Sequence, residues 1–155
     1  MNYSDELKNR LQDNLLLVRR CAGWTSEELG EKVGLGRQTI NSLEKRTNGY
    51  EMTKTQYIAI RTILQDEINE NQKDTILLSN VLDIFVDNPS NYSKEEKNKF
   101  LEKANILSKT KDTTRKQLSN DWADWLELII LAGISVGASI LSLNSSNRKI
   151  LKRIK

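Results

Sequence analysis

Residues that enforce a chain reversal are scarce in this sequence, which contains one proline and seven glycines among its 155 residues. A fold made of many short strands needs such residues at nearly every turn. Leucine, lysine and glutamate are abundant instead, and these residues favour long helices. The composition therefore predicts an all-α fold. The length allows one compact domain, or a domain of about 70 residues followed by an appendage.

The chain contains no histidine and a single cysteine, Cys21. Without histidine, Ser-His-Asp and Cys-His catalysis and His-containing zinc sites are excluded. We therefore expect no enzymatic activity, no metal and no cofactor. Cys21 allows no internal disulfide, and its apolar neighbours predict that it is buried. Met1 runs directly into a polar stretch rather than a signal sequence, so we expect the N-terminal part to lie in the cytoplasm.

The net charge of +3 is unevenly distributed along the chain. Residues 1–70 carry ten Lys or Arg and eleven Asp or Glu, a balance of −1, whereas residues 71–155 carry fourteen and ten, a balance of +4. Bulk charge therefore does not indicate that the first 70 residues bind DNA. Such a function has to rest on a few cations that face phosphate locally.

Apolar residues at helical spacing, and glycines that follow them, predict the first two helices. The first helix runs to about Cys21 and ends at Gly23. Its inward-facing residues are Leu7, Leu11, Leu15 and Val18. The second helix begins with a capping box, in which Thr25 and Glu28 each satisfy the other's free backbone donor, and it ends at Gly34.

Two further helices are predicted within the first 70 residues. One covers about 37–45, with Ile40 and Leu43 facing inward. Residues 46–52 form a polar loop, and Thr53 can cap the next helix. The inward-facing residues of that helix are Tyr57, Ile60, Ile63 and Leu64.

Residues 71–108 are predicted to form a helical extension of this domain. A fifth helix lies between about 66 and 86, with a break near Asn71, and its dense apolar run predicts burial. A turn over 87–92 contains the only proline. A lysine-rich helix then runs to about residue 107. Its capping box consists of Ser93 and Glu96.

Residues 26–45 have the features of a helical pair that binds DNA. A helix that reads bases must enter the major groove, about 12 Å wide, while a second helix braces it across the backbone. Gly30 is small where the two helices would touch, and Gly34 can adopt the positive φ that the turn requires. The apolar contact between the helices is supplied by Leu29, Ile40 and Leu43.

This pattern resembles the helix-turn-helix domain of the lambda-repressor and Cro-like family, also called XRE-like. The resemblance covers about residues 5–66 and is strongest over 29–34 and 39–44. It implies a helix-turn-helix domain over 1–70 that binds double-stranded DNA. It also implies a structural ion pair between Arg19 and Glu44, which would tie the first helix to the recognition helix.

Two sets of DNA-contacting residues are predicted: the base readers follow from the resemblance, and most of the phosphate-binding residues follow from their position just beyond the recognition helix. The base-reading positions are Arg37, Gln38, Asn41 and Ser42. Their chemistry agrees with that role, because Arg can donate two bonds to guanine, and Gln or Asn can pair with both edge atoms of adenine. The phosphate-binding positions are Ser26, Thr39, Lys45, Arg46 and Asn48. The sequence departs from the family in having Ser26 where Gln is usual, and in lacking the common proline around 50–53.

The C-terminal part combines a polar and an apolar segment. Residues 109–121 are polar, and we predict a linker or a solvated helix there. The nineteen residues 125–143 include one charge, Glu127. At about 1.5 Å per residue such a helix is about 28 Å long, close to the roughly 30 Å of hydrocarbon in a bilayer. We therefore predict a transmembrane helix over 122–143, followed by a basic tail over 144–155.

Trp122 and Trp125 suit a bilayer interface, and the basic tail suits a layer of lipid headgroups. We thus expect a cytoplasmic N-terminal domain attached to the cell membrane by a single-pass helix. The alternative is a wholly cytoplasmic protein in which the apolar helix is a dimer interface. Gly133 and Gly137 form a small-xxx-small pair that lets two helices approach closely. We expect a homodimer, which would present two recognition helices to a two-fold symmetric operator.

Three functions are consistent with these features. The first is a sequence-specific transcriptional regulator, repressor-like and tethered to the membrane. The second is a membrane-bound adaptor that uses the helix-turn-helix fold to bind another protein, because a fold alone does not determine function. The third is a soluble dimeric repressor or antitoxin.

Overall fold

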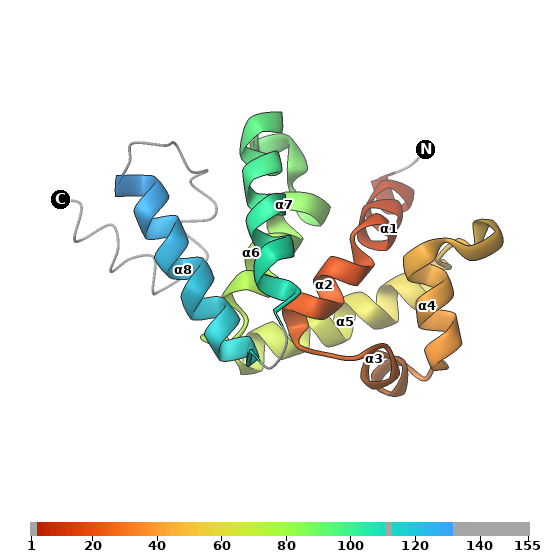
Figure 1. Cartoon of the computed structure of the whole chain (residues 1–155). Helices are drawn as coiled ribbons and strands as arrows, with labels where there is room; N and C mark the ends of the chain where they lie inside the picture. The colour runs from red at the N-terminus through yellow and green to blue at the C-terminus, as the bar shows by residue number, and fades with distance from the viewer. Residues whose placement is uncertain (1–2, 111–112, 132–155) are drawn as a thin grey trace.

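The structure is a computed structural model of the chain, and it describes residues 3–110 and 113–131 (Figure 1). All regular structure in these residues is helical, which confirms the all-α prediction. The long helices are α1 (Tyr3–Asp13), α2 (Leu15–Ala22), α3 (Ser26–Val33), α4 (Arg37–Lys45), α5 (Lys54–Glu70), α6 (Ile76–Leu82), α7 (Lys94–Ser108) and α8 (Arg115–Leu131). Three short turns of helix are η1 (Thr47–Gly49), η2 (Asp83–Asp87), which has π geometry, and η3 (Pro89–Asn91).

The segment predicted as one N-terminal helix is two helices, with a break at Asn14. Asn14 has φ −111° and ψ 9°, and its side-chain amide donates to the Arg10 carbonyl at 2.8 Å. This local bond competes with the regular helical pattern, as asparagine side chains often do. The apolar stripe crosses the break unchanged, and Leu11, Leu15 and Val18 are buried. Periodicity therefore identified the inward face correctly but not the break.

Local capping chemistry sets the other helix boundaries. The predicted capping boxes of α3 and α7, formed by Thr25 with Glu28 and by Ser93 with Glu96, are both present. The predicted cap Thr53 forms a third box with Gln56 at the start of α5. At their C-terminal ends, α2 and α3 close on Gly23 and Gly34, whose φ angles are 77° and 72°. Glycine adopts this left-handed conformation without the steric cost that other residues have.

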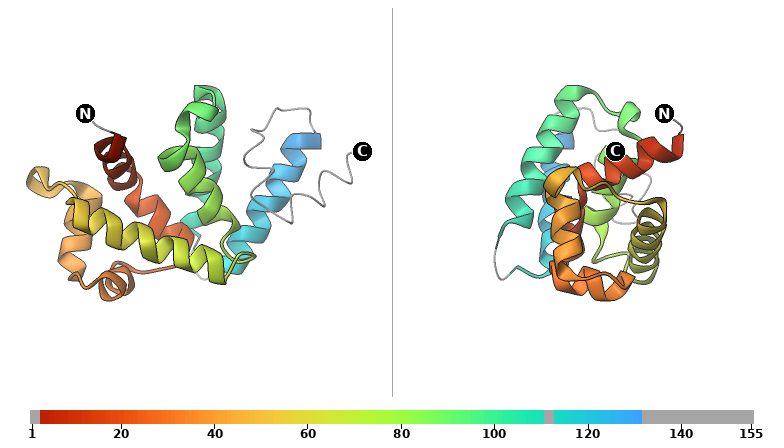
Figure 2. Two further views of the ribbon diagram at one scale, coloured as in Figure 1. Left: turned by 180° about the vertical axis from the view of Figure 1, so that it is seen from behind. Right: turned by 90° about the vertical axis from the view of Figure 1, so that its right-hand side faces the viewer.

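One apolar core extends from Leu11 to Leu126. Helix α2 lies at its centre and packs against α6, α7 and α8, while α5 runs along the back of the molecule (Figure 2). Helix α5 ends at Glu70, where the sequence placed the end of a domain, and α6 begins at Ile76; both helices contribute buried residues to this core. Cys21 is fully buried in this core, as predicted, and burial raises the pKa of its thiol.

The predicted polar linker over 109–121 is in part helical, because α8 begins at Arg115 and continues past residue 121. The buried face of α8 recurs at helical spacing and comprises Leu118, Ser119, Trp122, Leu126 and Ile129. In the sequence this stripe is divided between a polar and an apolar segment. Each half by itself contains too few apolar positions to show the helical period.

Trp122 is completely buried, and it joins α8 to α6 and α7. Its indole N–H donates to the Asn80 side-chain oxygen at 2.8 Å, and its ring centroid lies 6.0 Å from that of Phe100. Within residues 3–110 and 113–131, we find no helix with the length and apolar character that crossing a bilayer requires. The rest of the predicted transmembrane helix, including Gly133 and Gly137, and the basic tail over 144–155 lie outside the described residues.

Candidate nucleic-acid interface

Helices α3 and α4 form a compact pair at the end of the molecule opposite α8 (Figure 1). The turn between them consists of Gly34, Leu35 and Gly36. Gly30 of α3 lies directly under this turn, and a Cβ atom built on Gly30 would be 2.4 Å from the Leu35 carbonyl oxygen. The Leu35 amide in turn donates to the Gly30 carbonyl at 2.8 Å. This close backbone approach fixes how α4 leaves α3.

Replacing Gly30 with alanine is therefore expected to destabilise the protein by about 1–3 kcal/mol, the usual cost of overpacking. Helix propensity alone would favour alanine by about 0.5–1 kcal/mol, but the contact would be with backbone, which cannot move aside. Gly36→Ala is the matched control, because a Cβ there meets nothing within 4 Å and φ is −73°. Urea unfolding should show a change under about 1 kcal/mol for Gly36→Ala. Equal stability of the two variants would contradict the close contact.

Helix α4 has one apolar and one polar face. Ile40 and Leu43 are completely buried and anchor the helix to the core. On the other side, Arg37 and Gln38 are exposed in the first turn. Asn41 and Ser42, each four residues further along, are partly exposed on the same side. The structure therefore gathers all four predicted base-reading residues on the surface of one helix, at its N-terminal end and middle.

The N-terminus of α3 borders a surface hollow of about 470 Å³ that Arg37 also lines. Ser26, one of the predicted phosphate-binding residues, lies at this N-terminus, where free backbone N–H groups favour an anion. Arg19 and Arg20 contribute two further cations to the hollow, and Glu27 contributes an acid. Arg20 was not among the residues predicted from the sequence. The only feature of the sequence that could have indicated its role is its position next to Arg19, shortly before α3 begins at Ser26.

The ion pair implied by the family resemblance is present and largely buried. The Arg19 guanidinium donates through Nε and Nη2 to the two oxygens of Glu44, the second bond measuring 3.2 Å, and through Nη1 to the Trp24 carbonyl at 2.9 Å. The side chains are 13% and 4% exposed. The pair therefore joins α2 to the end of α4, and it removes the negative charge of Glu44 from the outer face of α4.

The other predicted phosphate-binding residues, one in the first turn of α4 and three near its C-terminal end, differ in their surroundings. Lys45 is exposed, and Thr39 is partly exposed. Arg46 ends α4 with φ 49°, and its guanidinium pairs with Asp13 at 2.7 Å. Asn48 is exposed and also has a positive φ, of 55°. A phosphate group would thus meet Lys45 directly, whereas it would have to compete with Asp13 for Arg46.

Gln12 of α1, which was not predicted from the sequence, holds the loop that follows α4. This buried side chain donates to the carbonyls of Leu43 at 3.1 Å and Tyr50 at 2.8 Å. Its oxygen accepts from the Met52 amide at 2.8 Å. These three bonds hold residues 46–52, a loop that contains no proline. Their partners are 31 to 40 residues away in sequence, so no local pattern could reveal them.

Within the described residues, no group of three or more Cys, Asp or Glu side chains is arranged to hold a metal ion. Comparison of the chain with protein-family models, with curated proteins and with solved structures finds no match.

Proposed function

We propose that the protein is a sequence-specific, repressor-like transcriptional regulator built on a helix-turn-helix bundle of the lambda-repressor and Cro type. In this proposal α4 enters the major groove of double-stranded DNA, and α3 crosses the backbone. The observation that carries the proposal is the division of α4 into two faces. Ile40 and Leu43 are fully buried, while Arg37, Gln38 and Asn41 point away from the core.

The exposed side chains of α4 have the donors and acceptors that base edges require. Arg37 can donate two bonds to guanine, and Gln38 and Asn41 can each pair with adenine. Ser42, one turn after Gln38, can meet either kind of base. The N-terminus of α3 and Lys45 would contact phosphates on either side, which orients the domain without reading sequence. Arg20 and Arg37 add positive charge where the first of these phosphates would lie.

Arg37→Ala is expected to relax preference at one base-pair position in a randomised-site selection. The loss at that position should be about 5- to 150-fold, which corresponds to about 1–3 kcal/mol for a bidentate contact. Lys45→Ala should instead weaken all sites equally and reduce the slope of log affinity against log salt by about 0.9. The control is Lys99→Ala on α7, whose side chain is 45% exposed. DNA binding unchanged by both α4 variants would refute the proposal.

The same selection separates the regulator from a protein-binding adaptor. An adaptor would bind DNA weakly and enrich no motif, whereas a regulator enriches a defined site. A homodimer, which we also propose, would enrich two half-sites about one DNA turn apart. Enrichment of a single half-site would support DNA reading by a monomer.

Membrane attachment through the apolar C-terminal segment is a separate proposal. The packing of α8 limits the length of chain that is available to span a bilayer. Trp122, Leu126 and Ile129 are packed in the core, so residues 132–143 alone would supply a helix of about 18 Å. This is shorter than the roughly 30 Å of bilayer hydrocarbon, and spanning therefore requires the last turns of α8 to leave the core. We expect the full chain, but not a chain ending at Leu131, in alkali-washed membranes. Recovery of both in the supernatant would favour a dimer interface.

A further inference from the structure

The connection between α7 and α8 begins and ends beside the hollow at the N-terminus of α3. Ser108, the last residue of α7, lines this hollow together with Arg20 and Arg37. At the other end of the connection, Arg115 begins α8. Its Cβ atom lies 3.3 Å from the position that a Cβ on Gly23 would occupy, and Gly23 lines the same hollow. Both ends of the connection therefore lie at the edge of the proposed phosphate site.

An exposed lysine follows each of these two contact points. Lys109 comes directly after Ser108, and Lys116 comes directly after Arg115. Because consecutive Cα atoms are about 3.8 Å apart, each lysine side chain starts within one residue of the edge of the hollow. Neither lysine forms an ion pair among the described residues. A lysine ammonium on its flexible stem can meet a phosphate without a fixed geometry.

The charge of this region favours an anion. Arg19 lines the hollow but is neutralised by Glu44, which leaves Arg20 and Arg37 with one acid, Glu27, on the lining. The two lysines of the connection bring the balance to four cations against that one acid. Neither the last turn of α7 nor the first turn of α8 contains an acidic residue. Such a local excess of positive charge attracts phosphate groups.

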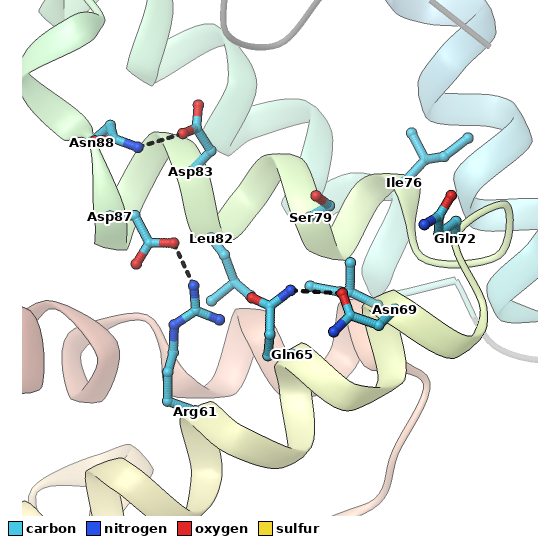
Figure 3. Close-up of a pocket in the computed structure, with 11 residues that line it drawn as sticks. Arg61, Gln65, Asn69, Gln72, Ile76, Ser79, Leu82, Asp83, Asp87 and Asn88 are labelled. Carbon is cyan, nitrogen blue, oxygen red and sulfur yellow. Dashed lines mark hydrogen bonds and ion pairs between the residues drawn. The ribbon is translucent and has the colours of Figure 1, made fainter. Parts of the chain in front are cut away.

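The hollow between α5 and α6 has the opposite character (Figure 3). Its cation, Arg61, is already paired, because it donates to Asp87 of η2 at 2.5 Å. The second acid on the lining, Asp83, accepts from Asn88 at 2.7 Å. Two acids against one paired cation oppose the approach of a polyanion. We therefore expect a nucleic-acid backbone on the side of the α7–α8 connection and not at the hollow between α5 and α6.

We infer that Lys109 and Lys116 bind phosphates of the DNA backbone next to the phosphate that meets the N-terminus of α3. Phosphates of one strand recur about every 3.4 Å along the duplex axis, so a strand that passes the hollow brings further phosphates within reach of both lysines. The inference rests on the proposed function and extends it beyond residues 5–66, to which the family resemblance applies. Contacts with the backbone add affinity and fix orientation but carry no sequence preference.

The salt dependence of binding between the full chain and a mixed-sequence DNA duplex tests this contact. The double variant Lys109→Ala, Lys116→Ala should reduce the slope of log affinity against log salt by about 1.8, since each phosphate contact contributes about 0.9. Lys109→Arg, Lys116→Arg keeps both charges and should retain the slope. The matched control is Lys94→Ala, Lys99→Ala, which removes the same charge from α7 at about 15 Å or more from Lys109 along the helix axis. This control should leave the slope unchanged.

The outcomes separate this inference from the proposed function. If Lys45→Ala lowers the slope and Lys109→Ala, Lys116→Ala does not, the inference alone is overturned. An equal reduction by the control variant would also overturn it, because the effect would then be one of bulk charge. A slope lowered by the lysine pair, with no change in base preference for Arg37→Ala, would support the inference and count against base reading by α4. If the wild type binds no duplex, both are overturned.

Ethylation interference on a duplex that the randomised-site selection enriches gives a second readout. An ethylated phosphate cannot bind its lysine, so ethylation at a contacted position weakens binding. The wild type should show interfering phosphates at one edge of its footprint that are absent for Lys109→Ala, Lys116→Ala. Identical interference patterns would contradict the contact. Both lysines are exposed, and circular dichroism checks that the variants are folded.

Discussion

Replacing Arg19 with methionine is expected to reduce the free energy of unfolding by about 3–5 kcal/mol, the usual cost of breaking a buried ion pair. The reason is the environment of Glu44, whose side chain is only 4% exposed. Without Arg19, a carboxylate remains in the core with no compensating charge. The Trp24 carbonyl also loses the hydrogen bond that Arg19 Nη1 donates at 2.9 Å. Guanidinium unfolding followed by circular dichroism measures the loss.

The double variant Arg19→Met, Glu44→Leu should recover most of this stability. Replacing a whole buried pair by apolar residues of similar volume is often neutral or even stabilising, by about 1–4 kcal/mol. The control is Arg46→Met, which breaks the pair with Asp13, whose side chain is 59% exposed. Such exposed pairs contribute about 0–1 kcal/mol. A double variant as unstable as the sum of the two single variants would contradict a dominant role for the isolated buried charge.

This ion pair also bears on the proposed recognition of DNA. A free carboxylate at Glu44 would lie at the end of the helix that carries Arg37 and Lys45, and it would repel phosphate. Pairing with Arg19 neutralises that charge and fixes the end of α4 against α2. Stability and DNA affinity should therefore change separately in the double variant. The free energy of unfolding should recover. The affinity for DNA should recover only to the extent that α4 keeps its position against α2.

The residues of the candidate site that could be predicted from the sequence make contacts with residues close to them in the chain. Thr25 and Glu28 cap α3 three residues apart, and Gly34 supplies the positive φ of the next turn. Gly30 contacts the carbonyl of Leu35, only five residues later. Gln12 and Arg20 were not predicted, because their importance depends on packing between distant segments. Gln12 bonds backbone atoms 31 to 40 residues away, and no periodicity or spacing encodes such contacts.

The fold beyond residue 70 shows a different limit of sequence reasoning. Hydropathy joins Trp125 to Leu143 as one apolar run, but the structure assigns the first part of that run to the protein core. Over a few residues, an amphipathic helix can have the same composition as the start of a membrane-spanning helix. The break at Asn14 was missed for a related reason, since the apolar stripe continues through it.

Helix α8 is joined to the proposed DNA-binding bundle by Arg115 as well as by apolar packing. Its guanidinium pairs with Glu67 of α5 and lies 3.4 Å from the Ala22 carbonyl at the end of α2. Both side chains of the pair are about one-fifth exposed, at 20% and 18%. A change in the position of α8 would therefore act directly on two helices of the bundle. If membrane attachment displaces α8, the contacts that Arg115 makes with α2 and α5 would change.

Trp122→Ala is expected to reduce the free energy of unfolding by about 3–5 kcal/mol, the usual cost of removing a buried aromatic side chain. Trp122 is completely buried between α6, α7 and α8, so the surrounding helices cannot collapse fully into the space. Asn80 would also lose its bond from the indole N–H, and its amide nitrogen already has no partner among the described residues. Thermal and urea unfolding of the full chain measure the effect.

Two variants show which part of this effect comes from packing. Trp122→Phe keeps an aromatic ring but leaves Asn80 without its donor, and it should cost about 1–3 kcal/mol. Leu128→Ala lies on the same helix at a side chain that is 66% exposed, and it should change stability by less than about 0.5 kcal/mol. If Trp122→Ala is as mild as Leu128→Ala, α8 does not belong to the core. Its apolar residues would then be available to a bilayer or to a second copy of the chain.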